Sequence, residues 1–77
     1  MEENLRIFST RLKQLRKEKK NTQREMALLI EKTERHYQDI EAGKINISSM
    51  LLLKLADYFN VSTDYLLGRT DRREVNR

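Results

Sequence analysis

The sequence contains no cysteine and no proline, and only two glycines and one histidine among its 77 residues. Without cysteine there is no disulfide and no thiolate metal site, and a lone histidine does not supply the usual ligands of a zinc site. The lack of proline and the scarcity of glycine favour helix, because these two residues are the strongest helix breakers. A chain of this length forms one domain, and folding hides only roughly 60% of its unfolded surface. We therefore expect a small core built from packed helices, alone or with a second copy.

Several function classes lack their signatures. No apolar run is long enough to span a bilayer, and the N-terminus, Met1 to Asn4, lacks the apolar stretch of a signal peptide. We expect a cytoplasmic protein with no membrane partner. There is no P-loop, no glycine-rich strand turn, no Ser-His-Asp motif and no metal cluster, so we expect no enzymatic activity, no cofactor and no metal. The formal net charge of +4 instead favours an anionic partner, nucleic acid first.

Apolar spacing and capping residues predict five short helices and no strand. Apolar residues three and four positions apart predict a first helix from about Asn4; they are Leu5, Phe8, Leu12 and Leu15. Thr22 and Glu25 have the spacing of a capping box, which predicts a second helix over about 23–30. Further N-caps are expected at Thr33, Ser48 and Ser62, and left-handed helix ends at Gly43, Asn60 and Gly68.

These elements predict a domain at residues 4–68 and a charged, frayed C-terminal tail at 69–77. The second and third helices have the pattern of a helix-turn-helix, at about 23–42. Ala27 is small enough for the helix crossing, and apolar residues anchor both helices from below: Met26, Ile30, Tyr37 and Ile40. Leu52, Leu55, Ala56 and Phe59 of the fourth helix are expected to face inward. The outer face of the third helix is polar: Glu34, Arg35, Gln38 and Asp39.

Four segments carry a resemblance to a known family: RLKQLR at 11–16, TQREMA at 22–27, IEAGK at 40–44 and LLKLADYFNVSTDYLLG at 52–68. In this order and spacing they resemble the lambda-repressor-like, Xre-type helix-turn-helix regulators, which include phage repressors and Cro proteins. The resemblance implies an all-α, compact five-helix DNA-binding domain. It further implies sequence-specific binding of a double-stranded DNA operator and transcriptional regulation, usually repression.

The resemblance also implies roles for single residues. Gln23 and Lys44 match positions that contact DNA phosphates, and Thr33 matches the start of the recognition helix, where base and phosphate contacts concentrate. Arg16 and Glu41 match a structural ion pair between the first and third helices. Loss of either partner would cost about 3–5 kcal/mol if the pair is buried.

The residues of the outer face suggest how bases are read. Arg35 can form two hydrogen bonds with guanine O6 and N7, and Gln38 can pair with adenine in the same way. Glu34 and Asp39 accept hydrogen bonds, for which cytosine N4 is the natural donor. We expect Arg35 to be the main specificity residue. Two copies are expected on a two-fold-symmetric operator, with half-sites about one helical turn apart and no small-molecule ligand.

The turn and the second helix depart from the family pattern. Glu31 and Lys32 stand where glycine and a small apolar residue are usual, so Glu31 carries a strain of about 1–2 kcal/mol unless the turn is rebuilt. Leu28 and Leu29 stand where polar residues are usual. They indicate either a partner surface or extra packing at the edge of the core.

A protein-interaction module on the same fold, such as an antitoxin-like or anti-regulator subunit, is the alternative function. Its contact residues would be Leu28, Leu29 and two tyrosines, Tyr58 and Tyr65, which suit edge packing of the core somewhat better than a dimer surface. Other side chains also leave two interpretations open. His36 faces either DNA or solvent, the spacing of Tyr37 favours the core over base stacking, and the basic face of the first helix is either solvated or bound to DNA. Arg11 and Lys13 are the hardest positions there to assign.

Overall fold

The computed structural model describes residues 2–75. Five helices form in this part of the chain: α1 (Glu2–Glu18), α2 (Gln23–Leu29), α3 (Glu34–Glu41), α4 (Ser49–Phe59) and α5 (Thr63–Leu66), and it contains no strand. The all-α architecture is as expected from the sequence. Two boundaries differ: α1 begins at Glu2 rather than near Asn4, and α2 ends at Leu29 with Ile30 as its C-cap. Acidic residues in the first turn of α1 suit the positive end of the helix dipole, which favours the earlier start.

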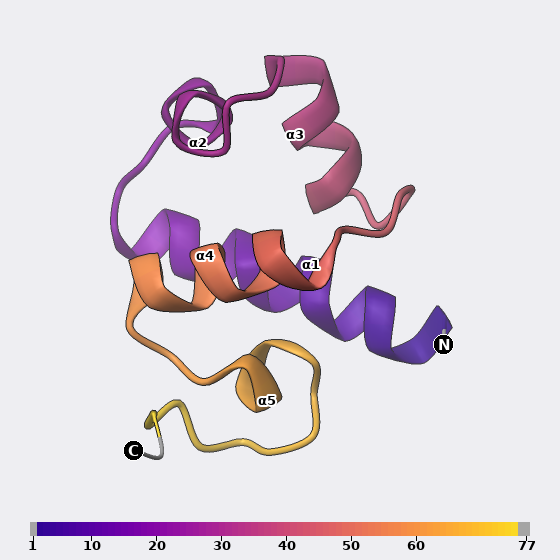
Figure 1. Ribbon diagram of the computed structural model, residues 1–77, viewed down its shortest axis with the longest axis vertical. Coiled ribbons are helices and arrows are strands. Elements are labelled where there is room, and N and C mark those ends of the chain that lie inside the picture. The colour runs from indigo at the N-terminus through magenta and orange to yellow at the C-terminus, as the bar shows by residue number, and fades with distance from the viewer. Residues whose placement is uncertain (1, 76–77) are drawn as a thin grey trace.

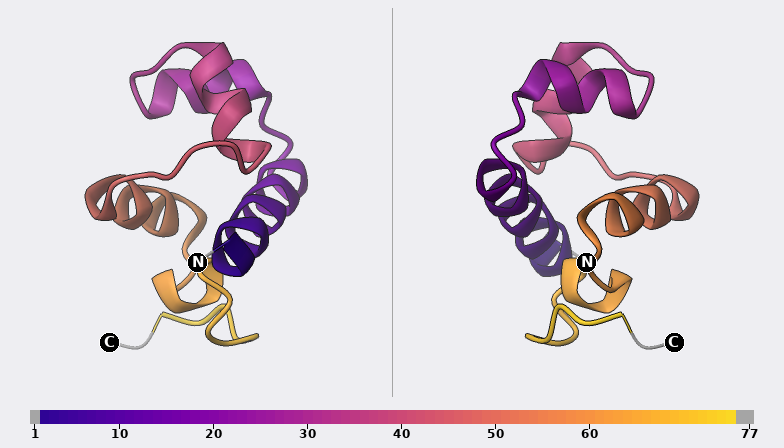
Figure 2. Two further views of the ribbon diagram at one scale, coloured as in Figure 1. Left: turned by 90° about the vertical axis from the view of Figure 1, so that its right-hand side faces the viewer. Right: turned by 90° about the vertical axis from the view of Figure 1, so that its left-hand side faces the viewer.

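The helices are arranged around α1. Figure 1 shows α2 and α3 together at one end of the molecule, and α5 with the C-terminal segment at the other. The two views of Figure 2 show α1 and α4 between these ends, with the linker from α3 leading into α4. Since α1 contacts both α3 and α5, it connects the helix-turn-helix to the C-terminal part of the chain. The whole domain measures 31 × 25 × 21 Å.

A single apolar core joins all five helices. Its fully buried large side chains are Leu12, Met26, Tyr37, Ile40, Leu55 and Leu66. Most of the side chains expected to face inward do so, including Ala27, Ile30 and Ala56, whereas Leu52 and Phe59 are only half-buried. Each fully buried large apolar side chain stabilises the fold by about 1.5–3 kcal/mol, so this small set accounts for much of the stability.

Local capping chemistry fixes the helix ends where the sequence predicts them. Thr22 Oγ1 accepts from the Glu25 backbone N–H at 3.0 Å, and Glu25 Oε1 accepts from the Thr22 N–H at 2.7 Å, which completes the capping box. Hydroxyl caps also begin α3, α4 and α5, at Thr33, Ser48 and Ser62. Gly43, Gly68 and Asn60 have the expected positive φ, and Lys20 has one that the sequence did not suggest.

The segment after α5 is not frayed as predicted, because it packs back onto α1. The Ser62 N–H donates to the Arg73 carbonyl at 2.9 Å. The Arg73 guanidinium donates two 2.8 Å hydrogen bonds to the Glu18 carboxylate, and Arg11 donates to the Thr70 carbonyl at 2.7 Å. The prediction therefore fails for residues up to 73. The last two residues of the predicted tail, Asn76 and Arg77, lie outside the described residues.

Candidate nucleic-acid interface

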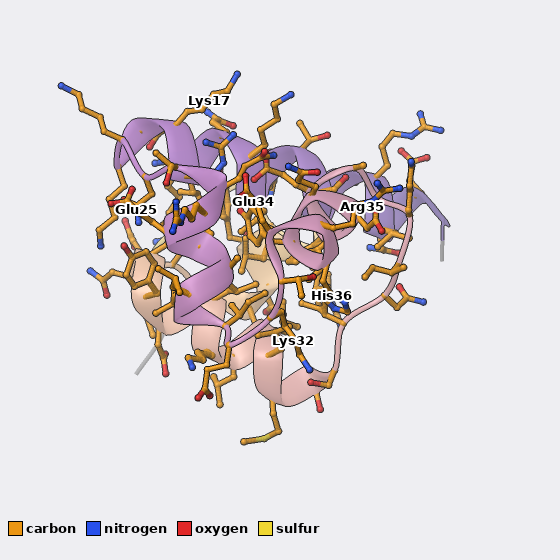
Figure 3. All side chains as sticks on the ribbon, turned by 90° about the horizontal axis from the view of Figure 1, so that it is seen from above. Lys17, Glu25, Lys32, Glu34, Arg35 and His36 are labelled. Carbon is orange, nitrogen blue, oxygen red and sulfur yellow. The ribbon has the colours of Figure 1, made fainter. Side chains whose placement is uncertain are left out.

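The outer face of α3 is exposed because the opposite face is fixed in the core. Tyr37 and Ile40 are completely buried beneath the helix. Glu34, Arg35 and Gln38 are exposed, and the fourth expected reading residue, Asp39, is half-buried. Figure 3 shows this face from above, with Glu34, Arg35 and His36 around the start of α3. The structure therefore brings together, on one helix surface, the four side chains that the sequence suggested for base reading.

Arg35 and Asp39 form an ion pair along this face. Nε of Arg35 lies 3.4 Å from Oδ1 of Asp39, one helical turn away. The Arg35 side chain is 78% exposed and that of Asp39 is 29% exposed. The contact uses Nε, and the two terminal nitrogens of Arg35 form no hydrogen bond with another described residue. Arg35 is thus partly oriented by Asp39 while its terminal donors face solvent.

The turn before α3 keeps a left-handed residue although no glycine is available. Glu31 has φ 58°, and the Lys32 N–H donates to the Ala27 carbonyl at 3.0 Å to close α2. Thr33 then caps α3 by accepting from the His36 N–H at 3.0 Å. Of the two alternatives that the sequence left open, the rebuilt turn is therefore wrong. Glu31 keeps the left-handed conformation and carries its strain of about 1–2 kcal/mol.

A buried ion pair holds α3 against α1. Arg16 Nε donates to Glu41 Oε2 at 2.8 Å, and Nη2 donates to Oε1 at 3.0 Å. The two side chains are only 12% and 3% exposed. Arg16 Nη1 donates to the Asn21 carbonyl at 2.9 Å, and the Gln23 amide nitrogen donates to Glu41 Oε1 at 3.3 Å. The cluster therefore links α1, the start of α2 and the end of α3, which sets the position of the helix-turn-helix on the domain.

The electrostatics of this cluster favour its charged form. Burial would raise the pKa of Glu41, but the adjacent Arg16, Tyr37 and Gln23 side chains together outweigh it, and the pKa lies below its usual value. The hydrogen bonds to Glu41 raise the pKa of Arg16. Burial, and then the adjacent Glu41 carboxylate, raise the pKa of Tyr37. Since Tyr37 is fully buried, it packs in the core and does not stack on a base.

The three residues expected to contact phosphates lie at the borders of the α3 face. Gln23 is the first residue of α2, Thr33 is the N-cap of α3, and Lys44 follows Gly43 just beyond α3. Lys44 is exposed, and its N–H donates to the Asp39 carbonyl at 3.0 Å. Gln23 is half-buried and its amide nitrogen is engaged by Glu41, so its side chain is held in one orientation.

The residues of the possible partner surface, Leu28, Leu29, Tyr58 and Tyr65, differ in how far they are exposed. Leu28 is 71% exposed on α2, whereas Leu29 packs against the core. Tyr65 is buried beneath the Arg11 guanidinium, which lies 4.2 Å from its ring centre, so its proposed place in a dimer surface is wrong. Tyr58 remains half-exposed, with Lys19 Nζ 4.0 Å from its ring centre. These contacts place the Arg11 guanidinium within the fold, against Tyr65 and the C-terminal segment.

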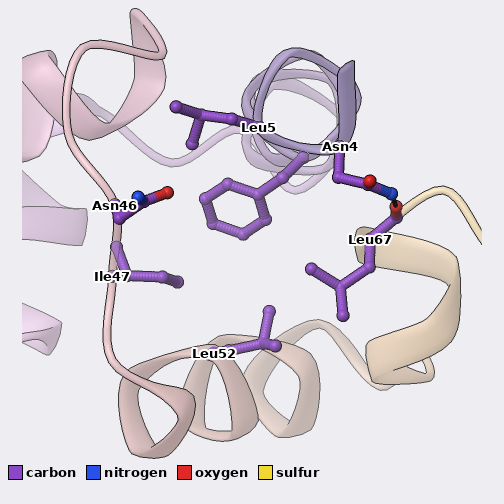
Figure 4. Close-up of a pocket in the computed structure, with 7 residues that line it drawn as sticks. Asn4, Leu5, Asn46, Ile47, Leu52 and Leu67 are labelled. Carbon is purple, nitrogen blue, oxygen red and sulfur yellow. Dashed lines mark hydrogen bonds between the residues drawn. The ribbon is translucent and has the colours of Figure 1, made fainter. Parts of the chain in front are cut away.

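A second surface feature is an apolar hollow of about 260 Å³ between α1, α4 with the linker before it, and the end of α5 (Figure 4). Its lining residues are Asn4, Leu5, Phe8, Asn46, Ile47, Leu52 and Leu67. The Asn4 amide nitrogen donates to the Leu67 carbonyl at 2.7 Å at its edge. No charged side chain lines the hollow, so it does not suit a phosphate group and is distinct from the α3 face.

Residues 2–75 are free of two other kinds of feature, a membrane-spanning helix and a metal-binding cluster. No helix there is both long enough and apolar enough to cross a membrane. The same residues contain no group of three or more histidine, cysteine, aspartate or glutamate side chains placed to hold a metal ion. The exposed face of α3 is therefore the main candidate site of this part of the chain.

Comparison with known proteins gives one match. Residues 12–66 match a family described as helix-turn-helix, a range that covers α2, α3, α4 and α5 and the C-terminal part of α1. Comparisons with curated proteins and with solved structures gave no match. The matched range includes the buried Arg16–Glu41 pair and the whole outer face of α3.

Proposed function

Since the chain belongs to the Cro/C1-type, lambda-repressor-like helix-turn-helix family, which binds DNA sequence-specifically and regulates transcription, we propose that it is a repressor whose α3 reads the major groove. The observation that carries this proposal is the exposed polar face of α3 on a helix fixed from below. Arg35 projects from this face with 78% of its side chain exposed. A major groove about 12 Å wide admits one helix in this way.

The proposed base contacts follow from hydrogen-bond chemistry. Arg35 donates two hydrogen bonds to guanine, and Gln38 pairs with adenine. Glu34 accepts from cytosine N4, as does Asp39 where its contact with Arg35 permits. The ion pair gives Asp39 a further role, because it limits the directions in which the Arg35 guanidinium can point.

Backbone contacts would fix the register of α3 in the groove. Gln23, Thr33 and Lys44 border the α3 face and are the proposed phosphate contacts. Because Glu41 holds the amide of Gln23, the buried ion pair would also determine where that phosphate lies. The fold and the contact to DNA thus share one cluster of side chains.

Binding as a homodimer on an inverted repeat is part of the proposal. A single small DNA-binding module buries only about 600–1,000 Å² of surface, which limits its affinity. Two copies with half-sites about one helical turn apart would double the contacts and match a two-fold-symmetric operator.

Selection of binding sites from random duplex DNA tests this function. We expect an enriched inverted repeat containing guanine in each half-site. Arg35→Ala should bind the selected site about 10- to 100-fold more weakly and lose the preference at guanine. Its thermal unfolding should be unchanged, since the side chain is exposed. Lys54→Ala, which removes an exposed charge on α4, is the control and should keep the preference; an Arg35→Ala variant with unaltered affinity and preference would contradict the proposal.

The exposed Leu28 favours one other function, a protein-interaction module on the same fold. Salt distinguishes the two functions. Phosphate contacts make the logarithm of the affinity fall steeply with the logarithm of the salt concentration, whereas an apolar protein contact responds weakly. Leu28→Gln should leave DNA binding unchanged if α3 carries the function.

A further inference from the structure

We propose that a row of basic side chains on α1 binds the phosphate backbone of DNA beside the bases that α3 reads. The row consists of Arg6, Lys13 and Lys17 and is called the α1 basic stripe below. The inference rests on the proposed function and extends the DNA interface to a helix outside the helix-turn-helix.

The spacing of the stripe places its members on one side of α1. Lys13 follows Arg6 by seven residues, and Lys17 follows Lys13 by four, so all three lie along one line of an α-helix. All three side chains are exposed. The stripe is about 17 Å long, because each residue of an α-helix adds about 1.5 Å.

Contacts between α1 and α3 show which side of α1 this is. Ser9 and Arg16 face α3: Ser9 Oγ lies 3.2 Å from where a Cβ atom on Gly43 would stand, and Arg16 pairs with Glu41. Lys13 is four residues after Ser9 and three before Arg16, so it lies directly beside this row. The middle of the stripe therefore lies at the border between α1 and the C-terminal end of α3.

On α3, the exposed residues nearest this border belong to the outer face of the helix. Gln38 precedes Glu41 by one helical turn, and Glu34 precedes it by two. In Figure 3, Lys17 lies on the α1 edge of the view, and Glu34 lies between Lys17 and His36. The α1 basic stripe and the outer face of α3 therefore form one continuous surface.

The charges of the stripe form no ion pair with any side chain of residues 3–75, whereas Arg11 and Arg16 on the same helix are both paired. Glu18, the acidic residue nearest the stripe in sequence, is bound by Arg73. The stripe contributes three of the 16 lysine and arginine residues of a chain whose net charge is +4. Such unpaired charges gain from binding phosphates, because counterions are then released.

The surroundings of the stripe favour a phosphate backbone over a membrane or a protein. Thr10 and Gln14, the exposed residues between its members, are polar, and the apolar side of α1 is buried in the core. A membrane-surface helix needs a bulky apolar face beside its basic one, and a protein interface needs an apolar centre. The stripe has neither.

The experiment compares a double variant, Lys13→Gln with Lys17→Gln, with the wild-type protein on the selected operator. Affinity is measured by fluorescence anisotropy at several salt concentrations, on duplexes with long and with trimmed flanks. We expect the slope of log affinity against log salt to become less steep by about 1.8 for each bound copy, and so by about 3.6 for a dimer on the inverted repeat. Binding to all sequences in low salt should weaken about tenfold. Base preference should stay the same. On trimmed duplexes the two proteins should bind equally.

Matched variants make the result specific. Lys54→Gln with Arg69→Gln removes the same charge elsewhere and should leave the slope nearly unchanged, whereas Lys13→Arg with Lys17→Arg should restore it. The inference is overturned if the Lys13/Lys17 variant keeps the wild-type slope, or if the Lys54/Arg69 variant loses as much, while the wild-type protein still selects an operator. If the wild-type protein selects no operator, the proposed function fails and this inference fails with it.

Discussion

The two sides of α1 both carry basic residues but differ in what those residues contact. On the side toward the C-terminal segment, Arg11 donates to the Thr70 carbonyl and to the Asp71 carboxylate, and Glu18 binds Arg73. On the side bordering α3, the α1 basic stripe is exposed and forms no ion pair among the described residues. One side therefore uses charge to hold the fold together, and the other presents charge to a ligand.

This difference shows that a basic residue on a DNA-binding domain is not by itself a DNA contact. What decides its role is whether the fold supplies a carboxylate or carbonyl partner. A substitution on the partnered side should change the stability of the fold or of the docked C-terminal segment and leave the salt dependence of DNA binding unaltered. A substitution on the free side should do the reverse.

The largest effect is expected at Arg16, where a basic residue of α1 is both partnered and buried. Arg16→Ala leaves the Glu41 carboxylate, 3% exposed, without its charge partner. We expect the free energy of unfolding to fall by about 3 kcal/mol, and the melting temperature by more than about 10 °C. Thermal unfolding followed by circular dichroism measures this loss. An unchanged melting temperature would show that the pair contributes nothing to the fold.

The pH dependence of the stability gives an independent test of the Arg16–Glu41 ion pair. The pKa of Glu41 is lower in the folded protein than its ordinary value of 4.5. Its contribution to stability is therefore complete above the unfolded-state pKa and is lost as the pH falls through the folded-state pKa. Glu41→Gln should be less stable than the wild-type protein at pH 7, and its stability should change less as the pH falls below about 4.5.

Most of the helical architecture could be predicted from the sequence because it depends on local chemistry. A capping hydroxyl and the N–H that it bonds are three residues apart, so Thr33 and Ser48 can be identified within a short window. The docking of the C-terminal segment could not be predicted in this way. It depends on partners such as Glu18 and Arg73, which are 55 residues apart and have no local signature.

The candidate site was predictable to a similar extent. Helical periodicity alone places Arg35 on the outer face of α3, and the family resemblance suggested the pair of Arg16 with Glu41, which the structure contains. Sequence could not separate Arg11 from Lys13, because both are basic residues on one helix. Only the position of the C-terminal segment, which bonds Arg11 and leaves Lys13 exposed, distinguishes them.

A smaller effect is expected in the turn of the helix-turn-helix, where strain does not involve charge pairing. Glu31 has φ 58° and no ion pair in residues 2–75. Glu31→Gly should relieve the left-handed strain of about 1–2 kcal/mol, offset in part by the greater freedom of glycine in the unfolded chain. We expect a net gain of about 0.5–1 kcal/mol in urea unfolding. Lys32→Gly, at an adjacent position without positive φ, should destabilise; a gain there as well would refute strain at Glu31 as the cause.

The smallest effect is expected at Glu18, on the partnered side of α1. The hydrogen bonds from Arg73 lower the pKa of Glu18 below its ordinary value, so its contribution is present above the unfolded-state pKa and is lost as the pH falls through the folded-state pKa. Both side chains are nearly half-exposed, and Glu18→Gln should therefore cost little global stability at pH 7. It should release the C-terminal segment, which hydrogen exchange detects at the Ser62 N–H that donates to the Arg73 carbonyl.

Glu3→Gln is the matched control for this change, since Glu3 is an exposed carboxylate on the same helix with no ion pair among the described residues. Exchange at the Ser62 N–H should rise with Glu18→Gln and not with Glu3→Gln, and the difference between the two variants should vanish in acid, where wild-type Glu18 is protonated. The salt dependence of DNA binding should be equal in both. A steeper slope for Glu18→Gln alone would mean that Arg73, once released, binds phosphate, and the division between the two sides of α1 would then reflect competition for the same arginine.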